Sequence, residues 1–198
     1  MMQKIKDHVN LFLENQSTCI EKLSAQTEII AKITNLLIKT RDQGKNIYVM
    51  GNGGSGSTAS HFVSDLLKTA ITRGNKRFSA ISLVDNTSVI LAWSNDSSYE
   101  EIFVEQLHNL LSKGDVVIAF SGSGKSKNII KAFKFAKKKG AYCIGFTGMN
   151  GGYFPKLSDI CCIVNSNDML IIESAHLALC HCIITTIRKL GKPIFRYE

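Results

Sequence analysis

The chain has 198 residues, of which 44% are hydrophobic and 20% charged, and its formal net charge is +8. This size and apolar content suit one globular unit with a sizeable core. We expect no apolar run as long as the roughly 20 residues of a membrane span, and early charges exclude a signal-peptide core, so we expect a cytoplasmic protein without a membrane partner. The basic residues form no arginine-rich or aromatic-interleaved tract, which argues against a nucleic-acid partner.

The cysteines show neither a C-x-x-C pair nor the spacing of a zinc ribbon. Most of them stand in apolar runs, which is typical of buried free thiols in a reducing compartment. The six are Cys19, Cys143, Cys161, Cys162, Cys180 and Cys182.

Residues 3–42 carry apolar side chains at helical spacing. The pattern predicts two helices, or one bent helix, with a break near Gln16 and Ser17. Gly44 is the expected stop, because glycine readily closes a helix. A helical region over residues 1–44 can pack against another subunit or cover this chain's own sheet. The sequence leaves both alternatives open, and packing in an oligomer is the hypothesis carried forward.

From Lys45 onward the pattern alternates between short apolar strands and amphipathic helices. This alternation predicts one compact α/β unit over residues 45–198, built on an open parallel sheet with helices on both faces, in three layers. Ligands of such sheets bind at the carboxyl ends of the strands. The expected strands are 46–50, 79–84, 115–120, 141–146 and 160–164, and the expected helices are 57–70, 87–93, 99–111, 126–139 and 169–190.

A glycine-rich loop, Gly51–Ser57, follows the first strand and opens a helix. Glycine lets the backbone approach a ligand closely, and the free N–H groups at a helix start favour an anion. His61 and Asp65 lie four apart on that helix and therefore share a face. The stretch predicts an anion-holding loop with a titratable pair beside it.

A second strand–loop–helix unit contains the serine-rich loop 121–126. Its hydroxyls and backbone N–H groups could hold a phosphate without a metal, opposite the first loop at the same sheet edge. Gly124-Lys125-Ser126 resembles the end of a P-loop, but the position that needs the first glycine is Ala119, which argues against a nucleotide-binding P-loop.

Taken together, these motifs resemble the SIS (sugar isomerase) domain family and, within it, the phosphoheptose isomerases. The resemblance spans nearly the whole chain. It rests on Gly51-Asn52-Gly53-Gly54-Ser55 followed by His61, on Asn95-Asp96, on Phe120-Ser121-Gly122-Ser123-Gly124-Lys125-Ser126, on Thr147-Gly148-Met149-Asn150-Gly151-Gly152, and on a last helix with Glu173, His176 and His181.

The resemblance implies a flavodoxin- or Rossmann-like SIS fold and a homotetramer whose active sites take residues from neighbouring subunits. It implies a phosphate site at Ser121, Gly122, Ser123 and Ser126, and sugar contacts from Asn52, Gly53, Gly54, Ser55, Asn95, Asp96 and Glu173. It also implies one zinc ion per subunit, held by His61, Asp65, Glu173 and His181. The general base and general acid of the family fall on Asp65 and His181.

Two positions depart from the family pattern. The family usually has Glu where this chain has Asp65, and Gln where it has Glu173. The shorter base could stand more than an ångström from the carbon acid, and a misplacement of that order can cost about 100-fold in rate. Glu173 adds a negative charge that favours a cation, and it could act as an alternative catalytic base. We hypothesise that the two carboxylates have exchanged roles.

Aldose–ketose isomerisation proceeds through an enediol and needs a base, an acid and stabilisation of developing oxyanion charge. The resemblance implies conversion of sedoheptulose 7-phosphate to D-glycero-D-manno-heptose 7-phosphate for surface polysaccharide such as lipopolysaccharide. One alternative is a non-catalytic SIS protein, like DiaA, that binds the replication initiator DnaA. A further alternative is an isomerase or binding module for another sugar phosphate.

Overall fold

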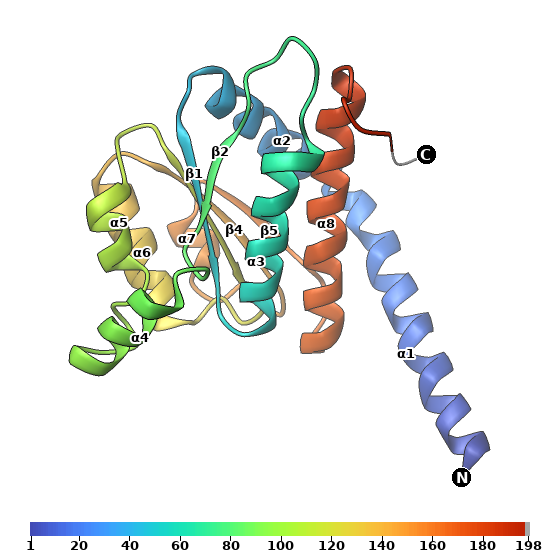
Figure 1. Ribbon diagram of the computed structural model, residues 1–198. Coiled ribbons are helices and arrows are strands. Elements are labelled where there is room, and N and C mark those ends of the chain that lie inside the picture. Colours follow the sequence, from blue (N-terminus) through green and yellow to red (C-terminus); the bar gives the residue numbers. More distant parts are fainter. Residues whose placement is uncertain (197–198) are drawn as a thin grey trace.

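The computed structural model describes residues 1–196 and is built on a five-stranded parallel sheet with strand order β2-β1-β3-β4-β5 (Figure 1). The expected α/β class and parallel sheet are thus confirmed. The chain places β2 on one side of β1 and β3 on the other, which makes the β1/β3 boundary the topological switch point. The strands are β1 (Asn46–Gly51), β2 (Ser79–Ser82), β3 (Val116–Ser121), β4 (Tyr142–Thr147) and β5 (Ile160–Ile163).

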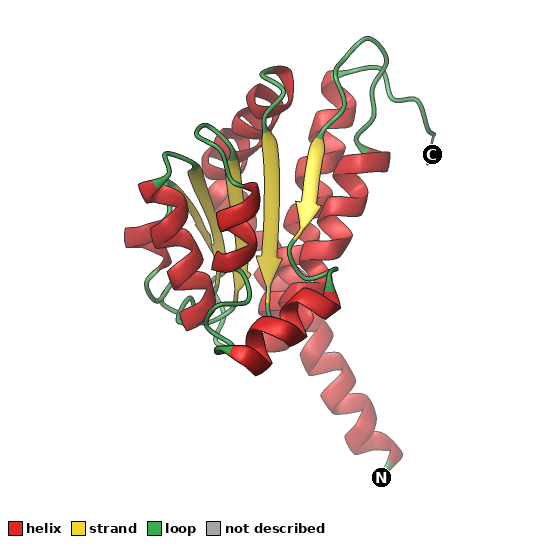
Figure 2. Ribbon diagram, turned by 60° about the vertical axis from the view of Figure 1, so that its left-hand side comes forward, coloured by secondary structure: helices red, strands yellow, loops and turns green. Residues whose placement is uncertain are grey.

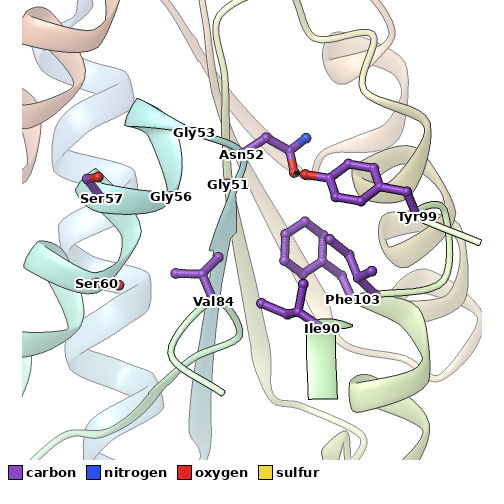
Figure 3. Close-up of a pocket in the computed structure, with 11 residues that line it drawn as sticks. Gly51, Asn52, Gly53, Gly56, Ser57, Ser60, Val84, Ile90, Tyr99 and Phe103 are labelled. Carbon is purple, nitrogen blue, oxygen red and sulfur yellow. Dashed lines mark hydrogen bonds between the residues drawn. The ribbon is translucent and has the colours of Figure 1, made fainter. Parts of the chain in front are cut away.

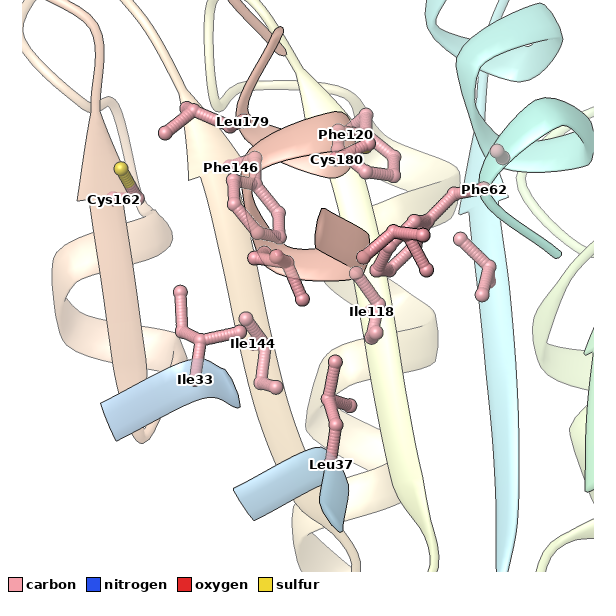
Figure 4. Close-up of a cluster of buried hydrophobic side chains, with 14 of the residues drawn as sticks. Ile33, Leu37, Phe62, Ile118, Phe120, Ile144, Phe146, Cys162, Leu179 and Cys180 are labelled. Atoms are coloured by element: carbon pink, nitrogen blue, oxygen red, sulfur yellow. The ribbon is translucent and has the colours of Figure 1, made fainter. Parts of the chain in front are cut away.

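Helices cover both faces of the sheet and give three layers (Figure 2). One face packs against α2, α3 and α8, around a core that includes Phe62, Phe120 and Phe146 (Figure 4). The other face packs against α5, α6 and α7, with Tyr48 and Phe133 in its core. The helices of the sheet unit are α3 (Gly54–Ser64), α4 (Thr87–Asp96), α5 (Val104–Leu110), α6 (Lys127–Lys138), α7 (Phe154–Leu157) and α8 (Met169–Leu190).

The N-terminal helical region divides into α1 (Met2–Lys22), a 3-10 turn (Leu23–Gln26) and α2 (Thr27–Asp42). The expected break near residues 16–17 is wrong, because α1 continues through Gln16 and Ser17 to Lys22: polar side chains interrupt the apolar pattern without interrupting the helical backbone. The chain bends where it reaches the sheet: the Gln26 amide donates to the Ile163 carbonyl (2.6 Å) and accepts from the Ile163 N–H (3.1 Å). Helix α2 packs on the sheet, whereas helix α1 projects from the body (Figure 1).

The structure differs from the expected elements in three smaller ways. The helix expected over residues 99–111 is only α5, since residues 100–103 form turns. Helix α3 passes directly into a π-helical turn, Asp65–Thr69, which the sequence pattern does not predict. Helix α7 was not expected at all, because four residues are too few to show a helical period.

Helix α8 corrects the expectation about apolar runs. Among the described residues it is the one helix with the length and hydropathy of a membrane span, at 22 residues and a mean hydropathy of 1.7. Half of that window is buried inside the fold, and Ile172, Leu179 and Ile183 belong to the core beneath the sheet. The apolar composition of α8 is therefore explained by its burial as a central core helix.

Candidate active site

The two loops that the sequence singles out meet at the carboxyl ends of the neighbouring strands β1 and β3. In the first loop Gly53 has a φ of +55°, and α3 begins at the next residue. A side chain at Gly51 would overlap the backbone carbonyl of Ser55. Glycine is therefore required for this tight entry into α3, as the loop motif predicts.

The serine-rich loop forms a cavity of about 300 Å³ at the switch point. The Ser121 and Ser126 hydroxyls lie 3.2 Å apart, and the Ser123 hydroxyl accepts from the Lys125 N–H at 3.3 Å. Helix α6 begins at the end of this loop, so its N-terminus adds favourable potential for an anion. The cavity is lined by Asn52, Gly53, Gly54, Ser55, Phe120, Ser121, Gly122, Ser123, Ser126, Met169 and Glu173.

Glu173 enters this cavity from α8 rather than joining the histidines. A side chain at Gly54 would overlap the Glu173 carboxylate, so the carboxylate lies directly against the glycine loop. Glu173 therefore sits among the expected sugar-binding residues Gly53 to Ser55, at one end of the site.

His61, Asp65 and His181 form a separate group between α3 and α8. The two histidine Nε2 atoms are 3.0 Å apart, and Asp65 Oδ2 lies 3.4 Å from His61 Nε2 and 3.9 Å from His181 Nε2. The Asp65 side chain is 16% exposed, while both imidazoles are about half-exposed. One carboxylate oxygen thus faces two imidazoles at the rim of the fold.

This group fits a zinc ion. All three ligand atoms lie within 4.8 Å of one another. Ligands at about 2.0–2.1 Å from a tetrahedral zinc stand about 3.3 Å apart, which is close to the separations seen here. Two imidazoles and one carboxylate are also a donor set that catalytic zinc uses, with the fourth position left open.

The expected fourth ligand, Glu173, is not part of this group. Eight residues separate it from His181, and on a helix this spacing turns only about 80° but rises about 12 Å along the axis. The angle puts both side chains toward one face of α8, but the rise sets them apart along it. Within one chain, this rise separates the Glu173 carboxylate from the group that contains His181.

Asn95 and Asp96 stand apart from both loops. They occupy the last turn of α4, where the Asn95 amide donates to the Asp96 carboxylate at 2.7 Å. Neither residue lines the serine cavity. Their expected sugar-binding role stays a prediction, because this single chain does not bring them to the serine cavity.

A second cavity of about 310 Å³ lies on the other side of the glycine loop (Figure 3). Its wall is mostly apolar, with Val84, Ile90 and Phe103 beside the polar loop. Tyr99 spans it and donates from its hydroxyl to Asn52 Oδ1 at 2.9 Å. Sequence reasoning missed Tyr99, which no motif marks except its place three residues after Asp96.

His176 lies fully buried on α8, in contact with the rings of Phe120 and Phe146. Its Nε2 is 3.3 Å from the Thr147 carbonyl, and its Nδ1 has no hydrogen-bond partner among the described residues. Burial lowers the pKa of this imidazole to about 4, so it is neutral at neutral pH. The Thr147 hydroxyl in turn donates to the carbonyl of Gly122, which connects His176 to the serine loop.

Comparison with known proteins identifies the family of this chain. A family model described as the SIS domain matches residues 11–148. The phosphoheptose isomerase of Helicobacter pylori (strain P12) is 37% identical over 179 residues, which is 90% of this chain and 92% of the relative. That of Aliarcobacter butzleri is 36% identical over 176 residues, or 89% of this chain and 93% of the relative.

Solved structures show the same fold. A phosphoheptose isomerase from Francisella tularensis matches with a TM-score of 0.87 at 27% identity, over 92% of this chain and 97% of that one. The phosphoheptose isomerase GmhA from Neisseria gonorrhoeae matches with a TM-score of 0.87 at 24% identity, over 93% of this chain and 99% of that one. The resemblance drawn from the motifs is confirmed: the chain belongs to the SIS domain family and, within it, to the phosphoheptose isomerases.

Proposed function

We infer that this chain is an aldose–ketose isomerase that converts sedoheptulose 7-phosphate to D-glycero-D-manno-heptose 7-phosphate. The observation that carries the inference is the pairing of a serine-rich phosphate cavity at the carboxyl ends of β1 and β3 with a carboxylate–imidazole group between α3 and α8. The curated relatives with this architecture are named phosphoheptose isomerases. They do not favour the DiaA-like alternative, in which the chain would bind DnaA without catalysis.

In the proposed mechanism the phosphate binds the hydroxyls of Ser121, Ser123 and Ser126, and the glycine loop lines the sugar. Asp65 removes a proton from C1 of the ketose, and the electron pair moves to form the C1–C2 enediol while His181 donates a proton to the carbonyl oxygen. Returning a proton to C2 and removing one from the C1 oxygen completes the aldose. The atoms balance without an external oxidant or reductant.

The proposed role of Asp65 is supported by its Oδ2 atom, which faces both imidazoles. In a metal-bound form, His61, Asp65 and His181 would instead be ligands of a zinc ion, and the His181 Nε2 atom would then not be the proton donor. When bound, zinc supplies Lewis-acid polarisation of the carbonyl. A fourth protein ligand, if Glu173 provides it, must come from a neighbouring copy, since this chain's own Glu173 is too far along α8.

The wider biological assignment is also a proposal. A homotetramer is supported by the apolar side chains that α1 exposes. A cytoplasmic location is supported by six free cysteines, four of them buried. The product would feed heptose into surface polysaccharide such as lipopolysaccharide.

The test is to incubate the pure protein with sedoheptulose 7-phosphate and follow the aldose anomeric signal by NMR, with and without added Zn²⁺. We expect turnover that a Ser121→Ala, Ser123→Ala double variant weakens mainly through KM. The absence of turnover under both metal conditions would overturn the proposal and return the non-catalytic alternative to the front.

A further inference from the structure

Asn52 occupies a special place, because it lines both cavities at the switch point. It follows β1 directly and forms the wall between the apolar cavity and the serine cavity. Figure 3 shows its amide meeting the Tyr99 hydroxyl across the apolar cavity. A ligand in either cavity could therefore contact the Asn52 side chain.

A backbone donor determines how this amide is oriented. The Ile129 N–H donates to Asn128 Oδ1 at 2.9 Å, which places the oxygen of Asn128 and therefore its nitrogen. Asn128 Nδ2 then donates to Asn52 Oδ1 at 2.9 Å, and Asn52 Nδ2 donates back to Asn128 Oδ1 at 3.1 Å. A flipped Asn52 would set nitrogen against nitrogen and oxygen against oxygen, so this orientation follows from the network.

Counting donors and acceptors gives the consequence. Asn52 Oδ1 accepts from both Asn128 and the Tyr99 hydroxyl, which uses its two lone pairs. Asn52 Nδ2 has two N–H groups and spends one on Asn128. One N–H is left, so Asn52 can offer a ligand a hydrogen-bond donor and no acceptor.

We propose that Asn128 and Tyr99 are positioning residues that fix Asn52 as a donor to an acceptor oxygen of the bound sugar phosphate. The identification of that ligand rests on the proposed function. Asn128 is 2% exposed and ties the start of α6 to the glycine loop, so it sets the amide from inside the fold. Tyr99 is 52% exposed and contributes from the cavity side, where it blocks the second lone pair.

A merely structural role would predict something different for Tyr99. A half-exposed tyrosine hydroxyl adds little to folding, so removing it would leave both stability and ligand binding unchanged. Positioning predicts instead that its effect passes through Asn52 alone. A double-mutant cycle separates the two.

The experiment measures the affinity of sedoheptulose 7-phosphate by calorimetry for four proteins: wild type, Tyr99→Phe, Asn52→Ala and the double variant. We expect Tyr99→Phe to weaken binding about 3- to 10-fold in the native background, the range for one neutral hydrogen bond. In the Asn52→Ala background we expect the same change to alter binding less than about twofold, because the residue it acts on is gone.

A second variant tests the other positioning residue. Asn128→Asp keeps an oxygen for the Ile129 N–H but places its other oxygen against Asn52 Oδ1, which removes the fixed orientation. The added negative charge weakens the binding of any phosphate-containing ligand. Inorganic phosphate therefore serves as the reference for this charge effect. We expect the sugar phosphate to lose more affinity than inorganic phosphate does.

Equal effects of Tyr99→Phe in both backgrounds, or none in either, would overturn the proposal. So would an Asn128→Asp variant that weakens both ligands alike. Turnover by the wild type is assayed separately: binding without isomerisation refutes the proposed function while the cycle still judges the positioning. A wild type that binds no sedoheptulose 7-phosphate overturns both.

Discussion

At the scale of single residues, Asp65 and Glu173 are the two candidate catalytic carboxylates, and the structure places them apart. The idea that Glu173 replaces Asp65 as the base requires both carboxylates to reach the same carbon. Glu173 instead lies against Gly54 in the serine cavity, while Asp65 faces the two histidines. Asp65 stays the proposed base, and the exchange of roles with Glu173 stays a hypothesis that kinetics can decide.

We predict that Asp65→Asn lowers kcat by about 100-fold to 10,000-fold, the usual contribution of a positioned general base. The isosteric Glu173→Gln is the matched control and is expected to change KM more than kcat, because Glu173 lines the substrate cavity. Steady-state kinetics with sedoheptulose 7-phosphate measures both. The assignment fails if Glu173→Gln costs more kcat than Asp65→Asn does.

His176 gives a second prediction, on stability. Its pKa falls from 6.5 to about 4 in the fold because burial disfavours the charged form, so the unfolded chain takes up its proton first as pH drops. The contribution of neutral His176 to the free energy of unfolding is complete above pH 6.5. As the pH falls from 6.5 toward about 4, the free energy of unfolding decreases by up to about 1.4 kcal/mol per pH unit.

Urea unfolding at several pH values between 7 and 5 measures this slope. The variant His176→Leu removes the group, and we expect the free energy of unfolding to fall less steeply with decreasing pH than in the wild type. Parallel curves for the two proteins would contradict a neutral buried imidazole.

At the scale of elements, the sequence predicted what local patterns control. The five strands appear within two residues of their expected ends, because short apolar runs between helices have few other places to go. The bend at Leu23–Gln26 could not be predicted, since it depends on Gln26 meeting Ile163, 137 residues away. Tyr99 and Asn128 were missed for the same reason: their contact with Asn52 is tertiary.

The serine loop yields a prediction about glycine. Gly124 has a φ of +61°, and a side chain there would overlap the backbone carbonyl of Gly151. Gly74 has a φ of +79° with open space around it, which makes it a matched control for the backbone cost alone. We expect Gly124→Ala to destabilise more than Gly74→Ala and, alone of the two, to weaken phosphate binding.

Thermal unfolding and calorimetry with inorganic phosphate supply the two measurements. The Gly74→Ala variant should lose roughly 1 kcal/mol from its left-handed backbone and keep the phosphate affinity of the wild type. A Gly124→Ala variant with unchanged affinity would show that the loop's shape does not depend on the contact between Gly124 and Gly151.

At the scale of the whole molecule, the three-layer unit leaves most of helix α1 without a packing partner among the described residues. Helix α1 buries a single residue, Cys19, and projects from the body (Figure 1). Ile5, Val9 and Leu13 share one face of it and are 49%, 51% and 58% exposed. The helical period in residues 3–42 predicted this amphipathic face but not which half would find a partner within the chain; the structure shows that α2 does and that most of α1 does not.

An apolar stripe on a projecting helix is the mark of a surface that another chain covers, and the proposed homotetramer supplies that chain. We predict that Val9→Glu, which places a charge in the stripe, lowers the native mass measured by light scattering toward that of a monomer. Asn10→Glu adds the same charge about 100° around α1 from Val9, beside the stripe rather than within it, and should leave the mass unchanged. Because the fold beyond residue 26 packs on its own sheet, the Val9→Glu subunit should keep its helical circular dichroism. A wild type that is already a monomer at micromolar concentration would refute the assembly through α1, and equal masses for the two variants would place the interface elsewhere.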